Sequence, residues 1–159
     1  MSASIFECFL VVILGGGVLA MAPAARGQTS SSSCQPTPAD ALGPFYKANA
    51  PERSSVGKGY RLSGVVRSAA DCSPLKGARL EFWLAGPDGR YGDEYRATVF
   101  SDPEGAYRFA SHIPPGYSGR PPHIHIRVSA SGYRTLVTQH YPAANQAEAT
   151  FDLVLIPGL

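Results

Sequence analysis

Residues 60–67 (YRLSGVVR) and 78–84 (ARLEFWL) decide the fold class, because the side chains in both alternate with a period of two. In the first stretch Leu62 and Val66 share one face, whereas Arg61 lies on the other. A period of two is typical of a β-strand that buries one face. Both stretches therefore predict strands of ordinary length.

Five more stretches have the composition of strands. They are residues 96–101, 106–112, 123–129, 134–139 and 150–156. Turn-forming residues separate them, notably Gly86-Pro87-Asp88-Gly89 and Asp102-Pro103-Glu104-Gly105, where proline presets φ and glycine permits a positive φ. No stretch keeps a helical period of 3.6. The sequence therefore predicts an all-β fold, an antiparallel β-sandwich of about seven to eight strands with long active-site loops.

The 159-residue chain is long enough for one domain with a hydrophobic core. Its formal net charge is +2, and only 16% of its residues are charged. Since no basic stripe appears along the chain, we expect no nucleic-acid partner.

The N-terminal residues differ from the rest of the chain. Residues 9–22 (FLVVILGGGVLAMA) are apolar, and Ala22-Pro23-Ala24 follows as a small-residue cleavage site. We expect a signal peptide over residues 1–27, a linker and N-terminal arm over 28–56, and a catalytic sandwich over 57–159. This predicts a secreted or periplasmic protein with no stable membrane insertion after cleavage. An uncleaved anchor is the alternative, since no Lys or Arg precedes the apolar run.

Export also bears on the cysteines. Cys8 lies in the expected leader, so cleavage would leave Cys34 and Cys72 as an even pair in an oxidising compartment. We expect a disulfide between them, and two free thiols are the alternative.

The stretch Arg120-Pro121-Pro122-His123-Ile124-His125 carries the strongest chemical signal. Residues i and i+2 share a face of a strand, so the two imidazoles project together and can share a metal ion. An isolated pair of this kind is more often a solvated strand face. A zinc or copper ion on the same histidines is a further alternative.

Two tyrosines change the balance. Tyr117 precedes the histidine pair, and Tyr91 follows the turn at residues 86–89. A phenolate oxygen is a hard anionic ligand, which suits a trivalent ion such as ferric iron. The metal must drive deprotonation, because the pKa of a free tyrosine is near 10.

The run from residue 42 to residue 141 resembles the intradiol ring-cleavage dioxygenases, the family of catechol and protocatechuate dioxygenases. The resemblance rests on Leu42-Gly43-Pro44-Phe45-Tyr46, Glu81-x-Trp83, Asp88-Gly89-x-Tyr91, Gly116-Tyr117, Gly119-Arg120-Pro121-Pro122-His123-Ile124-His125 and Thr138-Gln139. It implies an enzyme that cleaves catechol-type rings with dioxygen at a non-haem Fe(III) site, giving muconate-type diacids. It leaves a homo-oligomer open.

The resemblance also implies residue roles. Tyr91 and His123 would be equatorial ligands, and Tyr117 and His125 axial ligands. Tyr117 would leave the metal to act as a base. The substrate would contact Arg120, which stabilises developing charge, and two further residues, Gln139 and Tyr46.

A binding module without a catalytic metal is the rival interpretation. The stretch 64–109 also resembles transthyretin-like and carboxypeptidase-regulatory β-sandwich modules. That interpretation leaves Tyr117, Arg120, His123, His125 and Gln139 without a role.

Overall fold

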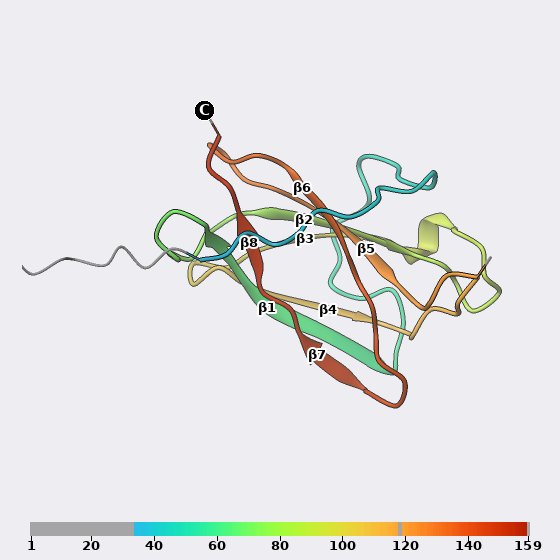
Figure 1. The fold of residues 1–159 in the computed structure, drawn as a ribbon. Helices are drawn as coiled ribbons and strands as arrows, with labels where there is room; N and C mark the ends of the chain where they lie inside the picture. Colours follow the sequence, from blue (N-terminus) through green and yellow to red (C-terminus); the bar gives the residue numbers. More distant parts are fainter. Residues whose placement is uncertain (1–33, 118, 159) are drawn as a thin grey trace, which may run out of the picture. The chain divides into compact units, whose positions relative to one another are not determined.

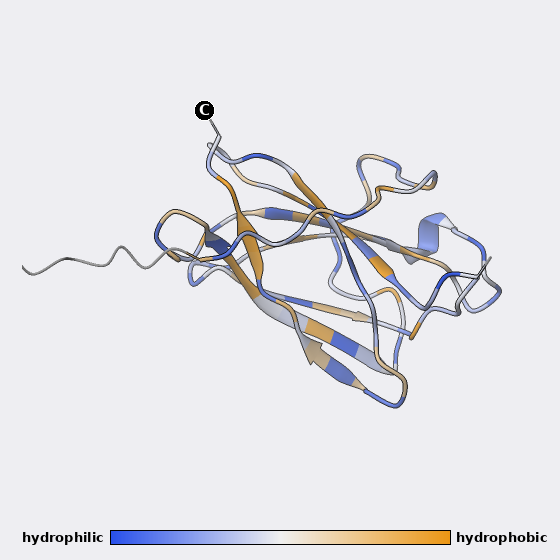
Figure 2. Cartoon of the chain, viewed as in Figure 1, coloured by the Kyte–Doolittle hydropathy of each residue, from blue (hydrophilic) through white to orange (hydrophobic). Residues whose placement is uncertain are grey.

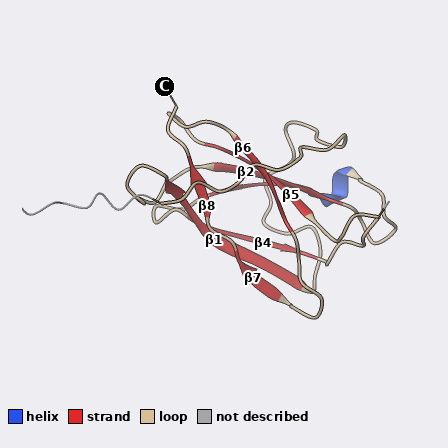
Figure 3. Ribbon diagram, in the orientation of Figure 1, coloured by secondary structure: helices blue, strands red, loops and turns tan. Residues whose placement is uncertain are grey.

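The computed structural model describes residues 34–117 and 119–158, which form two facing sheets (Figures 1 and 3). The expected leader, Cys8 and the first residues of the expected linker lie outside the described residues. The strands are β1 (Tyr60–Ser68), β2 (Arg79–Leu84), β3 (Arg96–Phe100), β4 (Ala106–Ser111), β5 (Ile124–Ser129), β6 (Leu136–His140), β7 (Glu148–Thr150) and β8 (Leu153–Leu155), and one 3-10 turn covers Asp93–Tyr95. In the described part of the chain, no helix is long and apolar enough to cross a membrane.

One sheet has the order β4–β1–β7, with β8 also paired to β1, and the other has the order β3–β2–β5–β6. Apolar side chains fill the space between them, and Figure 2 shows both strongly apolar and polar residues along β1. The rings of Phe82 on β2 and Phe109 on β4 stack with centroids 4.2 Å apart, which joins the two sheets. The predicted all-β sandwich is confirmed.

The C-terminal end departs from antiparallel pairing. One strand was expected over 150–156, but the structure has two short strands there, β7 and β8, and both run parallel to β1. The break occurs where Phe151 crosses Gly64, whose position has no room for a Cβ atom beside the Phe151 carbonyl. The Asp152 carboxylate accepts the Val65 amide at 2.9 Å in place of a backbone carbonyl, so strand pairing stops and then resumes.

The N-terminal arm, residues 34–56, packs along the edges of both sheets (Figure 1). Thr37 exchanges hydrogen bonds with Val154 of β8, and the Asp40 amide donates to the Val137 carbonyl of β6. Farther along, the Arg53 amide donates to Thr98 of β3. A disulfide joins Cys34 to Cys72 in the turn after β1, so the start of the arm is tied to the sandwich. The arm therefore caps strand edges that would otherwise have unpaired backbone groups.

Candidate metal centre

The two histidines lie at the start of β5 and are buried. His123 is 2% exposed and His125 is 0% exposed. Ile124 between them turns into the sandwich core, as the strand period predicts. Nδ1 of His123 lies 2.8 Å from the Pro121 carbonyl, which accepts a hydrogen bond only if Nδ1 carries the proton. The neutral ring then presents an unprotonated Nε2, the form in which imidazole binds a metal.

Tyr91 brings the first oxygen to this pair. Its hydroxyl lies 3.2 Å from Nε2 of His123 and 3.4 Å from Nε2 of His125. The Phe45 ring stacks on Tyr91 with centroids 4.3 Å apart and holds the phenol in place. Three potential donor atoms therefore converge on one point.

Tyr117 lies in the loop between β4 and β5 and packs beside the same rings. Its ring centroid is 5.8 Å from that of Tyr91 and 5.6 Å from that of His123. Its backbone pairs with Arg120 in an isolated bridge. The structure therefore brings together all four residues that the sequence singled out as ligands.

The protonation states of these residues suit the binding of a hard trivalent cation. Burial, together with the repulsion from His123, lowers the pKa of His125 to about 4, so its imidazole is neutral at pH 7. Burial, with a smaller effect of Tyr117, raises the pKa of Tyr91, so its phenolate forms only beside a strong positive charge. Among the described residues no group of three or more His, Cys, Asp or Glu could hold a metal ion. A metal here would therefore depend on the tyrosines.

Arg120 and Gln139 form a polar network next to the tyrosines and histidines. The Arg120 guanidinium donates to Oε1 of Gln139 at 2.8 Å, and the Gln139 amide donates to the Ala41 carbonyl at 2.6 Å. The positive charge of Arg120 acts on these residues, because it lowers the pKa of both Tyr91 and His125. In each case this effect on the pKa is smaller than that of burial. The structure thus brings both predicted substrate contacts to the site.

Tyr46 lies elsewhere. Its hydroxyl donates to the Glu81 carboxylate, with oxygens 3.2 and 3.3 Å away, and its ring packs edge-on against Trp83. Trp83 stands between Tyr46 and His125, so the predicted substrate contact of Tyr46 has no support in these positions.

Three residues that we did not assign to the site also line it. They are Asp40, Phe45 and Tyr141. The Tyr141 hydroxyl donates to the Asp40 carboxylate at 2.8 Å, and its ring centroid is 6.2 Å from that of His123. Phe45 belongs to the quoted motif at residues 42–46, so its presence there was the only signal in the sequence. Asp40 and Tyr141 gave none.

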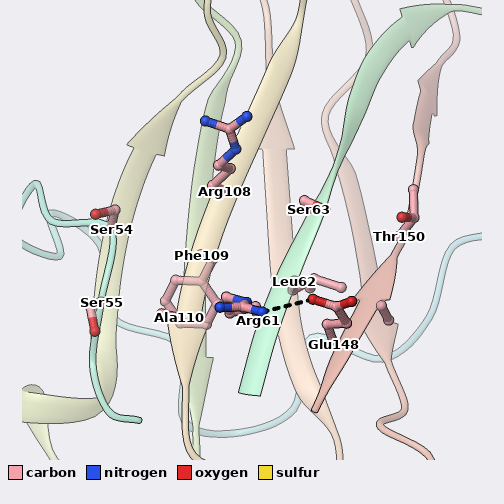
Figure 4. Close-up of a pocket in the computed structure, with 11 residues that line it drawn as sticks. Ser54, Ser55, Arg61, Leu62, Ser63, Arg108, Phe109, Ala110, Glu148 and Thr150 are labelled. Carbon is pink, nitrogen blue, oxygen red and sulfur yellow. Dashed lines mark hydrogen bonds and ion pairs between the residues drawn. The ribbon is translucent and has the colours of Figure 1, made fainter. Parts of the chain in front are cut away.

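A cavity of about 600 Å³ lies on the other sheet and is not part of the metal centre. It opens on the outer face of β4, β1 and β7, where Figure 4 shows Arg61 paired with Glu148 and the Arg108 side chain above them. Arg61 and Glu148 form a well-exposed ion pair at 3.0 Å.

Comparisons with known proteins point in one direction, although no family model matches the chain. The chain is 32% identical over 139 residues to a catechol 1,2-dioxygenase of Pseudomonas sp. (strain EST1001), covering 65% of this chain and 46% of that protein. It is 30% identical over 155 residues to a chlorocatechol 1,2-dioxygenase of Rhodococcus opacus, covering 73% and 57%. The chain thus spans about half the length of the curated relatives it matches.

A solved structure matches over its whole length. It is the dioxygenase domain of a fusion between a dioxygenase and a carbohydrate-binding protein, from the cellulolytic bacterium Streptomyces sp. SirexAA-E. The match has a TM-score of 0.70 and 31% identity, and it covers 78% of this chain and 100% of that one. These matches support the dioxygenase resemblance over the metal-free binding module.

Proposed function

Because this chain belongs to the family of intradiol ring-cleavage dioxygenases, we propose that it cleaves catechol-type rings between the two hydroxyl-bearing carbons with dioxygen. The convergence of the Tyr91 hydroxyl with Nε2 of His123 and Nε2 of His125 is the observation that carries the proposal. The relatives' names support catechol and chlorocatechol as the first substrates to test.

We propose non-haem ferric iron as the metal, held by the two tyrosines and two histidines, Tyr91, Tyr117, His123 and His125. When bound, the ion acts as a Lewis acid that makes the catechol dianion accessible near neutral pH and activates its ring toward dioxygen. The chain contributes a preorganised set of two nitrogen donors on buried histidines and two oxygen donors on half-buried tyrosines, which favours a ferric over a divalent ion.

Tyr117 is the better candidate for a mobile base, because the two tyrosines are held differently. The Tyr91 ring is stacked face to face under Phe45, whereas Tyr117 meets Phe45 only edge-on with centroids 6.4 Å apart. Both tyrosines lie on loops beside a glycine, so the contact with Phe45 is what distinguishes Tyr117. Its phenolate oxygen can therefore take a proton from a catechol hydroxyl with little disturbance of the other rings.

Arg120 supplies positive charge where the bound ring becomes anionic. Its guanidinium is fixed by Gln139, and the Gln139 amide is fixed in turn by the arm at Ala41. A cation that is already oriented stabilises developing negative charge without reorganising during the reaction.

We also propose export of the protein. The disulfide between Cys34 and Cys72 supports an oxidising compartment, since such bonds are rare in the cytosol. The apolar run at residues 9–22 is the other support.

Visible absorption and oxygen uptake test the proposal together. A tyrosinate bound to ferric iron gives a charge-transfer band, so the iron-loaded protein should be reddish and should consume dioxygen with catechol, chlorocatechol or hydroxyquinol. Tyr91→Phe should shift or abolish the band. Protein that stays colourless and inactive after iron is supplied would refute the proposed function.

A further inference from the structure

The imidazole of His125 packs against an indole ring and lies close to the backbone of the arm. One face stacks on Trp83, with centroids 4.8 Å apart and planes only 5° from parallel. Gly43 of the arm approaches the ring at Cε1, where a Cβ atom on residue 43 would lie only 3.1 Å away. The ring therefore has close packing neighbours at the indole and at the arm.

The two histidines are oriented by different means. His123 has the Pro121 carbonyl as partner for Nδ1, the usual way in which a metal-binding imidazole is held. Nδ1 of His125 is buried and has no hydrogen bond of regular geometry among the described residues, although the Ala41 carbonyl is near enough to interact with the ring. The orientation of His125 therefore depends more on packing against Trp83 and the arm.

The arm is anchored to the sandwich on both sides of Gly43. The Ala41 carbonyl accepts the Gln139 amide at 2.6 Å, and the Phe45 carbonyl accepts Nη1 of the buried Arg96 at 2.7 Å. Gly43 itself has a φ of +70°, which favours glycine over any residue with a side chain. The backbone between these anchors has little freedom to retreat from the imidazole.

The indole side is equally fixed. Trp83 lies on β2, the strand that pairs with β5, and is 1% exposed. The Tyr46 ring packs edge-on against it with centroids 5.1 Å apart. The Tyr46 hydroxyl is bound to Glu81, which an ion pair with Arg127 holds in turn at 2.7 Å. The structure thus gives Tyr46 a supporting position behind Trp83.

We propose that Gly43 and Trp83 are positioning residues that clamp His125 in its metal-binding orientation. The inference rests on the proposed function, because it takes His125 to be a metal ligand. It assigns the arm a part in metal binding, although none of the four donor residues belongs to the arm. A substituent at residue 43 should weaken metal binding by displacing the ring.

A matched pair of substitutions separates this effect from backbone strain. Gly43→Ala places a Cβ against His125. Gly77→Ala introduces a Cβ at almost the same φ, +69°, with no atom within 4 Å of it. Both variants have the cost of a positive φ for alanine, but only the first presses on the imidazole.

Two measurements on the full chain test the clamp, one of the His125 environment and one of ferric iron binding. In metal-free protein, the imidazole Cε1–H resonances of the four histidines are recorded by NMR, and His125→Gln identifies the one from His125. In titrations with ferric nitrilotriacetate, iron uptake is followed by the visible band and by emission of Trp83, the only tryptophan in the sequence. Trp83→Leu removes the stacked indole and its emission, so this variant is followed by NMR and by the visible band.

We expect Gly43→Ala to move the His125 resonance and to weaken ferric iron binding about 10-fold, the usual size of a second-sphere effect. Gly77→Ala should match the wild type in both measurements. Should Gly43→Ala fail to fold, Trp83→Leu is expected to show the same weakening of ferric iron binding. Equal iron affinity in the folded clamp variant and in Gly77→Ala would overturn the clamp alone. Wild-type protein that binds no ferric iron would overturn the proposed function and the clamp's role with it.

Discussion

Removing the disulfide by the double substitution Cys34→Ser and Cys72→Ser should destabilise the metal-free sandwich strongly. The two cysteines are 38 residues apart, and closing a loop of that length stabilises a fold by about 4 kcal/mol through the entropy of the unfolded chain. For a domain of roughly 120 residues, about 4 kcal/mol corresponds to a fall in Tm of about 15 °C. The hydrogen bonds of Thr37 with Val154, and that from the Thr138 hydroxyl to the Pro38 carbonyl, would then hold this end of the arm without a covalent link.

The assay is thermal and urea unfolding of metal-free protein, followed by circular dichroism with and without a reductant. The reductant should lower the Tm of the wild type to that of the double variant and should leave the double variant unchanged. A loss below about 1 kcal/mol would refute the loop-closure argument. It would mean that strand pairing and ring contacts of the arm already restrict the unfolded chain or hold the folded one without help.

Three further predictions concern charge, protonation and packing. Arg120→Met should lower kcat/KM for catechol about 100-fold, because oriented positive charge is lost, and oxygen uptake at several catechol concentrations measures it. Burial lowers the pKa of His140, so neutral His140 contributes fully above about pH 6.5 and the contribution is lost as pH falls. His140→Gln should therefore flatten the fall in unfolding free energy between about pH 7 and 5.5, measured with urea. Gly64→Ala should cost about 1–3 kcal/mol in the same assay, because its Cβ meets the Phe151 carbonyl, and a loss near zero would contradict that packing.

Strand periodicity predicted most of the sandwich, because alternation depends only on neighbouring residues. It could not predict the parallel pairing of β7 and β8 with β1, which depends on where the C-terminal chain returns in space. It also predicted that β2 would bury only one face, yet Glu81 on the other face is only 3% exposed. The arm and the ion pair with Arg127 cover that face, and an irregular proline-rich segment has no periodicity that would reveal this.

The candidate metal ligands could be found from the sequence, but the residues that support them could not. His123 and His125 are brought together by a single strand, so local spacing was enough to predict their shared face. The packing of Gly43 and Trp83 against His125 joins residues far apart in the chain. Tyr46 shows the same limit, because a motif placed it near the site while its ring lies behind Trp83.

The four candidate donors come from segments that follow β2 or lead into β5. Tyr91 follows the end of β2, Tyr117 precedes β5, and the histidines begin β5, so all four lie at one end of the sandwich. Leu84 of β2 pairs with Ile124 of β5 at that end, which fixes the two sides of the centre against each other through backbone hydrogen bonds. The arm then needs only to cover this end, and its anchors on β6 and β3 are the neighbours of those two strands. The proposed metal centre therefore depends on the central pair of strands and the arm, and the opposite sheet contributes through the core and through the loop that carries Tyr117 from β4 to β5.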